Sequence, residues 1–244
     1  YGIKLGNGGS VSNAGTILAY NGVGIFGNSG NGNTTIINGG TANTTALIQG
    51  LTAGVNAYGT RTVIVTNYGT IEATNPTSTA VILGNGGTAD HVTLSNKGTA
   101  SLIDGGSYGV TVNVAGGSVF NQGTITGGNV GVYMVMGGSI TNALGATING
   151  GFIGARITGA AGTITNYGTI QDTIRKGIYL GAGGTITNSD SAALITGGVG
   201  ISATGGATKI VNSGTSSGTG SYAISFADGA STFNNTVINS GAIN

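Results

Sequence analysis

The phrase Asn-x-Gly-Thr recurs along the chain, each time after a short stretch in which apolar and polar residues alternate. The full phrase begins at Asn13, Asn67, Asn96, Asn121, Asn166 and Asn212, and looser copies begin at Asn142, Asn188 and Asn239. From Asn67 onward the separations are 29, 25, 21, 24, 22, 24 and 27 residues. Asn13 and Asn67 are 54 residues apart, which is room for two periods with Asn38 as a degenerate middle copy. A repeat of this length predicts a solenoid in which each copy is one stacked unit.

Each period contains three short segments with strand character. Examples are the alternating segment at 162–166, a Gly-Thr-Ile segment at 168–170, and a glycine followed by alternating residues at 177–180. Glycine and asparagine separate the segments, and no segment keeps the 3.6-residue period of a helix. We therefore expect an all-β fold, a triangular parallel β-helix of about ten coils with three short strands per coil. A flat meander is the alternative, but it does not require one recurring corner.

The alternation also predicts what is buried. Strand geometry sends Ile164 inward and Thr163 and Thr165 outward. One coil cannot bury its apolar side chains alone, whereas stacked coils share one interior and satisfy each other's backbone. The 52 glycines first suggest disorder, but 39% of the residues are hydrophobic and regularly spaced, which favours a folded chain. We expect one domain over 1–244, with 28–61 as its least regular part.

The recurrent asparagine is predicted to be structural. Asparagine tolerates left-handed backbone angles at a corner, and the glycine two residues later adopts them without steric cost. Stacked in register, identical asparagine side chains can hydrogen-bond along the solenoid as a ladder. The predicted column contains Asn13, Asn67, Asn96, Asn121, Asn142, Asn166, Asn188, Asn212 and Asn239.

The residues that carry the repeat also carry a resemblance to a known family. The segment Gly-Thr-Ile-Thr-Asn-Tyr-Gly-Thr-Ile at 162–170, with its looser neighbours, resembles the passenger domains of bacterial autotransporters and related large surface adhesins. The similarity extends from Gly8 to Asn244 and is weakest between Asn28 and Arg61. It implies a right-handed β-helix, export to the bacterial cell surface, and adhesion. Because the membrane barrel that usually accompanies such passengers is absent, it also implies a cleaved passenger or a segment of a longer protein.

Charge and composition argue against several partners. The chain has seven Lys+Arg and six Asp+Glu, a net charge of +1, and no basic stripe for nucleic acid. Residues 105–155 carry no charge, but they are too rich in glycine, asparagine, serine and threonine for a membrane-spanning helix. The absence of cysteine excludes disulfides and thiolate metal sites. We expect neither nucleic-acid binding nor membrane insertion, and we identify no cofactor.

Catalytic residues are not predicted. Polysaccharide lyases and hydrolases share the β-helix architecture, but their chemistry needs carboxylates that converge on one face. The acids are Glu72, Asp90, Asp104, Asp172, Asp190 and Asp228, spaced about one per coil and mostly at different phases. Asp172 with Arg175 and Lys176 is interpreted as a solvated loop with an ion pair, and His91 beside Asp90 as a surface pair without a nucleophile. The calcium-binding nonapeptide is absent. The chain is therefore not expected to be an enzyme, and no catalytic, cofactor or metal residue is assigned.

Two outward columns are candidate binding surfaces. Alignment of the third segments stacks a polar and aromatic ladder, suited to a sugar ring or a partner chain. This ladder consists of Thr111, Tyr133, Arg156, Tyr179 and Ser202. The second column is made of outward Thr/Ser pairs, which resemble ice-binding solenoids. It consists of Ser10/Ser12, Ser139/Thr141, Thr163/Thr165 and Thr185/Thr187, with breaks expected at Val119–Phe120 and Lys209–Val211.

The ends of the solenoid predict a further partner. An uncharged sheet edge pairs with another strand, and no polar capping repeat is evident in the sequence. We therefore expect longer flanking sequence or copies that stack end to end into a fibre. The function expected is an extracellular structural or adhesive scaffold that binds copies of itself and surface glycans or host and abiotic surfaces. The alternatives are a polysaccharide-binding or polysaccharide-degrading protein and, third, an ice-binding solenoid.

Overall fold

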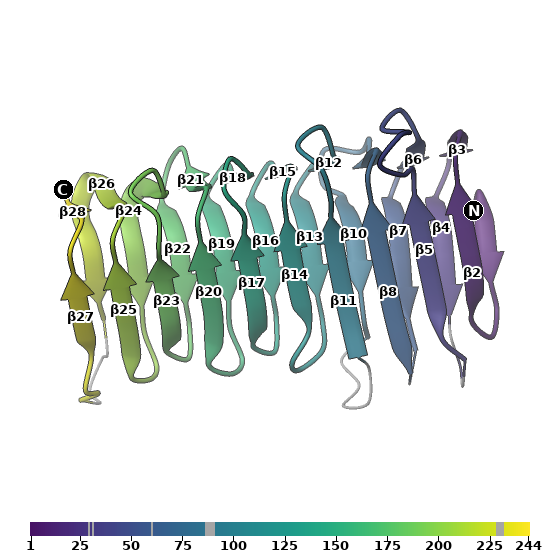
Figure 1. The fold of residues 1–244 in the computed structure, drawn as a ribbon. Coiled ribbons are helices and arrows are strands. Elements are labelled where there is room, and N and C mark those ends of the chain that lie inside the picture. The colour runs from purple at the N-terminus through teal and green to yellow at the C-terminus, as the bar shows by residue number, and fades with distance from the viewer. Residues whose placement is uncertain (29, 31, 60, 86–90, 228–231) are drawn as a thin grey trace.

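The fold is known from a computed structural model that describes residues 1–28, 30, 32–59, 61–85, 91–227 and 232–244. In these residues every regular element is a strand, and the strands of different coils pair in parallel. Figure 1 shows an elongated stack with the two termini at opposite ends. The predicted all-β parallel solenoid of about ten turns is confirmed.

The first column of strands forms a sheet of its own with ten members, one per coil. Its strands lie side by side along the whole stack (Figure 1). In order they are β2 (Gly9–Asn13), β5 (Thr34–Asn38), β8 (Thr62–Asn67), β11 (His91–Asn96), β14 (Ser118–Asn121), β17 (Gly138–Asn142), β20 (Gly162–Asn166), β23 (Gly184–Asn188), β25 (Thr208–Asn212) and β27 (Thr236–Asn239).

The second and third columns together form an 18-stranded sheet. The second column contains β3 (Thr16–Ala19), β6 (Leu47–Gly50), β9 (Thr70–Ala73), β12 (Leu102–Gly105), β15 (Thr124–Gly127), β18 (Thr147–Gly150), β21 (Thr169–Asp172) and β28 (Ala242–Ile243). The third contains β1 (Ile3–Leu5), β4 (Val23–Asn28), β7 (Ala53–Tyr58), β10 (Thr79–Leu83), β13 (Tyr108–Val112), β16 (Val130–Met134), β19 (Ile153–Ile157) and β22 (Lys176–Leu180). Two long strands, β24 (Leu194–Ala203) and β26 (Thr215–Phe226), run through both columns.

Three strands per coil are therefore found up to β22, and the second and third strands merge in the next two coils, as β24 after β23 and as β26 after β25. Within 28–61, β5, β6 and β7 pair in register with the coils on either side. The right hand and the triangular cross-section stay predictions from the resemblance and the repeat.

One continuous apolar core fills the solenoid. Isoleucine, valine and leucine from all three columns are fully buried and form a single cluster along the described chain. In β20, Ile164 is buried, whereas Thr163 is exposed and Thr165 is half-buried, as the alternation predicts. The inward side chains of each coil pack against those of the coils on either side, so no coil has a closed core of its own.

The corner between the first and second columns alternates between two forms. In one form the asparagine is followed two residues later by the glycine that precedes the next strand, as in Asn67-Tyr-Gly69. In the other, a longer corner ends at alanine or serine, as in the segment from Asn96 to Ser101. In register the corner residues are Gly15, Ala46, Gly69, Ser101, Gly123, Ala146, Gly168, Ala193, Gly214 and Gly241. The structural repeat at this corner is thus two coils up to Gly214, and the last coil repeats the glycine form at Gly241. The sequence analysis did not anticipate this repeat.

Candidate functional site

The last residue of every first-column strand is an asparagine, and these residues form a continuous internal ladder. The carboxamide Nδ2 of each one donates to Oδ1 of the asparagine in the next coil, at 2.8 or 2.9 Å, through nine consecutive hydrogen bonds. The ladder contains all nine predicted asparagines. Asn38 completes the ladder between Asn13 and Asn67. Its spacing indicates this position, although the residues that follow it depart from the repeated phrase.

The ladder is also bonded to the backbone. Nδ2 of Asn166 donates to Oδ1 of Asn188 at 2.8 Å, and it lies 2.9 Å from the Gly168 carbonyl and 3.2 Å from the Leu194 carbonyl. The asparagines from Asn38 to Asn212 are fully buried. Buried amides are tolerated only when hydrogen-bonded, and chains of such bonds polarise one another. The ladder therefore ties each coil to the next through the interior, and its donors all face the same end.

The physical reason predicted for the asparagine and the glycine is wrong. No described residue other than glycine has a positive φ, so the asparagines are not in the left-handed region. Of the glycines in the full phrase, only Gly98 does, with φ +87°. The glycine is needed for close approach instead: a Cβ on Gly168 would lie 2.2 Å from the Ala146 carbonyl oxygen, and one on Gly69 would lie 2.1 Å from that of Ala46.

The outer ladder lies on the third column, in the register that was predicted. Thr111, Tyr133, Arg156, Tyr179 and Ser202 are consecutive partners on β13, β16, β19, β22 and β24. The first four are half-buried, but Ser202 is only 4% exposed. Ser202 is therefore not part of an outward binding surface, which corrects the prediction for that residue.

The central three residues of this ladder are in contact. The Arg156 guanidinium lies 4.6 Å from the centre of the Tyr133 ring and 5.8 Å from that of Tyr179. The two tyrosine hydroxyls lie 3.2 Å from Oγ1 of Thr158 and 3.1 Å from Oγ1 of Thr204, which fixes both rings. An arginine held between aromatic faces keeps its N–H groups available at the edge of the guanidinium plane.

Residues three positions earlier on the same strands extend this face, and the sequence analysis missed them. Tyr108 stacks on Tyr133 with ring centres 6.2 Å apart, and the Lys176 ammonium lies 4.2 Å from the centre of the Tyr179 ring. Both residues directly precede the glycine of the third segment. They lie three residues before Thr111 and Tyr179, an odd separation that strict alternation would place inward, and two successive buried positions at Gly109–Val110 and Gly177–Ile178 bring them to the outer face instead. Alternation alone therefore could not have found them.

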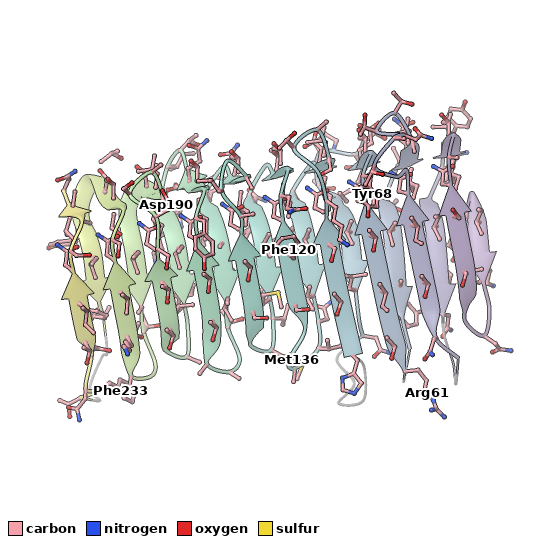
Figure 2. The ribbon with its side chains drawn as sticks, in the orientation of Figure 1. Arg61, Tyr68, Phe120, Met136, Asp190 and Phe233 are labelled. Carbon is pink, nitrogen blue, oxygen red and sulfur yellow. The ribbon has the colours of Figure 1, made fainter. Side chains whose placement is uncertain are left out.

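The outer face of the first column is rich in hydroxyl groups but interrupted. Ser139/Thr141, Thr163/Thr165 and Thr185/Thr187 lie in register on three successive coils. Phe120, labelled in Figure 2, stands on this face, and Ile64, Lys209 and Val211 occupy equivalent positions in other coils. Val119 does not break the array as predicted, because it points inward and is 2% exposed. Along the first-column strands that the structure describes, these interruptions leave no uniform Ser/Thr face of the kind an ice-binding solenoid presents.

Two carboxylates that were expected at different phases are neighbours. Glu72 and Asp104 are register partners on β9 and β12, and Nε2 of Gln49 donates to Glu72 from the coil on the other side. Partial desolvation and the Glu72 carboxylate raise the pKa of Asp104. The two acids were misaligned because the corner after Asn96 is longer than the corner after Asn67.

Asp172 is not part of the solvated loop that was expected. Its side chain is 8% exposed, and Oδ2 accepts hydrogen bonds from the backbone N–H groups of Ile174 and Arg175. Burial raises its pKa more than these backbone donors lower it. The carboxylate thus stabilises the corner between β21 and β22 through backbone hydrogen bonds. The predicted proximity of Asp172 to Arg175 is found, but the contact is with the Arg175 backbone and is structural.

His91 is the first residue of β11 and is exposed. Asp90 and Asp228 lie outside the described residues. Across the described ranges, no group of three or more histidine, cysteine, aspartate or glutamate side chains is arranged to hold a metal ion. Within the same ranges, no helix is long and apolar enough to cross a membrane.

Comparisons with known proteins find no match to a family model, a curated protein or a solved structure. The resemblance to autotransporter passengers and surface adhesins therefore rests on the repeat residues alone. What the structure adds is the architecture that the resemblance implies, a parallel β-solenoid of about ten turns.

Proposed function

We propose that this chain is an extracellular structural and adhesive scaffold of a bacterial cell surface that stacks end to end with further copies and acts without catalysis. The observation that carries the proposal is the internal asparagine ladder, nine consecutive hydrogen bonds through the described coils. The ladder couples every coil to its neighbours and needs neither charge nor disulfides. Such an interior suits an elongated rod that displays its outer faces.

The direction of the ladder supports stacking between copies. Every Nδ2 donates toward the C-terminal side, so one end of a stack presents a donor and the other an acceptor. At one end Asn239 donates to the Gly241 carbonyl, and at the other Oδ1 of Asn13 accepts from the Gly15 N–H. Two stacks of this kind match head to tail, which continues the parallel sheets in the same direction. The net charge of +1 does little to oppose such association.

A second candidate function is polysaccharide binding, favoured by the column Tyr133–Arg156–Tyr179. Aromatic faces and an arginine on a rigid sheet are the groups that proteins use against sugar rings and their substituents. On a surface scaffold this column would provide adhesion rather than degradation, so the two candidates are compatible. No homologue narrows the choice between glycan and abiotic surfaces.

Antibody labelling of the producing bacterium tests the proposed location. An antibody raised against the purified chain is expected to label intact cells, and protease added outside the cells is expected to remove the signal. A cytoplasmic marker that stays unlabelled is the control for cell integrity. Labelling that requires permeabilised cells would contradict the proposal.

A further inference from the structure

A surface hollow of about 280 Å³ lies where the third-column strands β13, β16 and β19 begin. It is lined by two aromatic residues, Tyr108 and Phe152, by two arginines, Arg156 and Arg175, and by the exposed Asn129. It adjoins the outer ladder through Arg156 but extends beyond it onto the corners that precede β16, β19 and β22. The hollow therefore combines rings, cations and an amide at the beginning of three paired strands of a rigid sheet.

Both arginines are held against rings. The Arg156 guanidinium lies 4.6 Å from the centre of the Tyr133 ring, and that of Arg175 lies 5.4 Å from the centre of the Phe152 ring. Nε of Arg156 is buried and has no hydrogen-bond partner among the described residues. Because Nε has almost no exposed surface, the terminal N–H groups of the guanidinium are the donors that remain for a ligand.

The hollow is electropositive. Arg156, Arg175 and the adjacent Lys176 are three of the seven cationic residues in the whole chain. The nearest acid in sequence, Asp172, uses Oδ2 to accept backbone N–H groups at its own corner. Glu72 and Asp104 lie on strands of the second column and do not line the hollow.

These groups select a chemical class of ligand. A planar guanidinium donates two parallel N–H groups to the paired oxygens of a carboxylate or a sulfate. A neutral sugar has no such pair of anionic oxygens. Aromatic rings stack on the apolar face of a pyranose. The Asn129 amide, which already donates to Oγ of Ser107 at 2.7 Å, keeps a carbonyl oxygen for a sugar hydroxyl.

We propose that this hollow binds an anionic sugar residue of an acidic polysaccharide. Arg156 and Arg175 hold its carboxylate or sulfate, and Phe152 and Tyr108 contact its ring. The inference rests on the adhesive part of the proposed function and names the ligand class for it. Surface labelling tests where the chain is located, whereas glycan binding is measured on the purified chain, so the two can fail separately.

The test is calorimetric titration of the purified chain with polygalacturonate, dextran sulfate and neutral dextran at physiological salt. Binding to either acidic polymer, without binding to dextran, is expected; polygalacturonate alone would assign the anion as carboxylate, and dextran sulfate alone as sulfate. Arg156→Gln and Arg175→Gln are each expected to weaken binding at least ~10-fold, the loss of one strong contact. Arg156→Lys keeps the charge but loses the two-pronged geometry and is expected to weaken binding as well.

Lys209→Gln is the matched control, because it removes the same charge from the outer face of the first column. It is expected to leave binding within about twofold, since screening weakens distant charges. Equal loss in Lys209→Gln and Arg156→Gln would overturn the proposal in favour of nonspecific charge attraction. Failure to bind either acidic polymer, or equal binding of dextran, would also overturn it. Unchanged thermal unfolding of each variant confirms that folding is intact.

Discussion

At the scale of the residue, position relative to the sheet decides what an asparagine does. Asn142 ends β17, points inward and bonds to both neighbouring asparagines and to two carbonyls. Asn149, seven residues later, points outward from β18, and its buried Oδ1 has no hydrogen-bond partner in the described chain. An asparagine side chain therefore joins neighbouring coils at position 142, whereas at position 149 it has an unsatisfied carbonyl oxygen.

We predict that Asn142→Ala destabilises the chain by about 1–3 kcal/mol, because it leaves buried donors and acceptors in two coils unpaired. Asn149→Ala is the control and is expected to change the free energy of unfolding by less than about 0.5 kcal/mol. Urea unfolding followed by circular dichroism measures both. Equal effects of the two substitutions would show that the ladder contributes no special stability.

The carboxylate pair gives a pH dependence with a definite sign. The pKa of Asp104 is raised in the folded state, so the folded chain binds more protons than the unfolded chain at pH values between the unfolded and the folded pKa of this group. Stability therefore falls as the pH rises through this range. Asp104→Asn removes the partly desolvated charge and its repulsion with Glu72, and it is expected to stabilise the chain at pH ~7, by less than about 1 kcal/mol since the pair is near solvent. The unfolding midpoints of variant and wild type should converge at pH ~3, where carboxyl groups are protonated. A difference that persists or grows in acid would contradict this explanation.

At the scale of the element, glycine is selected by the distance between neighbouring corners. From Gly15 to Gly214 the corner position alternates between glycine and a residue with a Cβ, and the glycines from Gly69 onward lie against a carbonyl of the preceding corner. Gly168 lies against Ala146, and Gly214 lies against Ala193, whereas nothing lies within 4 Å of a Cβ built on Gly15. This arrangement explains a recurring glycine without any left-handed backbone.

Gly168→Ala is expected to destabilise the chain by about 1–3 kcal/mol, because its Cβ would lie 2.2 Å from the Ala146 carbonyl oxygen and the coils would have to separate. Gly15→Ala occupies the same place in the same phrase and is the matched control. Its stability should stay the same or rise by up to about 1 kcal/mol, through loss of unfolded-state freedom. Thermal unfolding of both variants decides the matter, and a stable Gly168→Ala chain would refute the close-approach explanation.

The repeat and the alternation were sufficient to predict the columns. They assign Ile164 inward, Tyr133, Arg156 and Tyr179 to one outer ladder, and the asparagines to one register. They could not align elements across corners of different length. Glu72 follows its asparagine by five residues and Asp104 follows its own by eight, so the pairing of the two carboxylates appears only in the structure. The burial of Ser202 likewise depends on side chains from neighbouring coils, which no local pattern specifies.

At the scale of the whole molecule, the strand columns and the asparagine ladder run the length of the described solenoid, and the fully buried core extends from Ile25 to Ile210. Each coil contacts only its neighbours, so stability is the sum of similar interfaces and adding another coil adds another interface. A further copy that meets the chain head to tail would add the same hydrogen bonds that join its own coils. The proposed end-to-end assembly would therefore use the same kind of interface that joins coils within the chain.

Negative-stain electron microscopy of the purified chain, at several micromolar concentrations and across a salt series, tests the central claim most directly. End-to-end stacking predicts unbranched fibres that lengthen with protein concentration and persist at high salt, each copy adding about 45 Å at the spacing of β-strands. Discrete rods of single-copy length, unchanged by concentration, would contradict the claim.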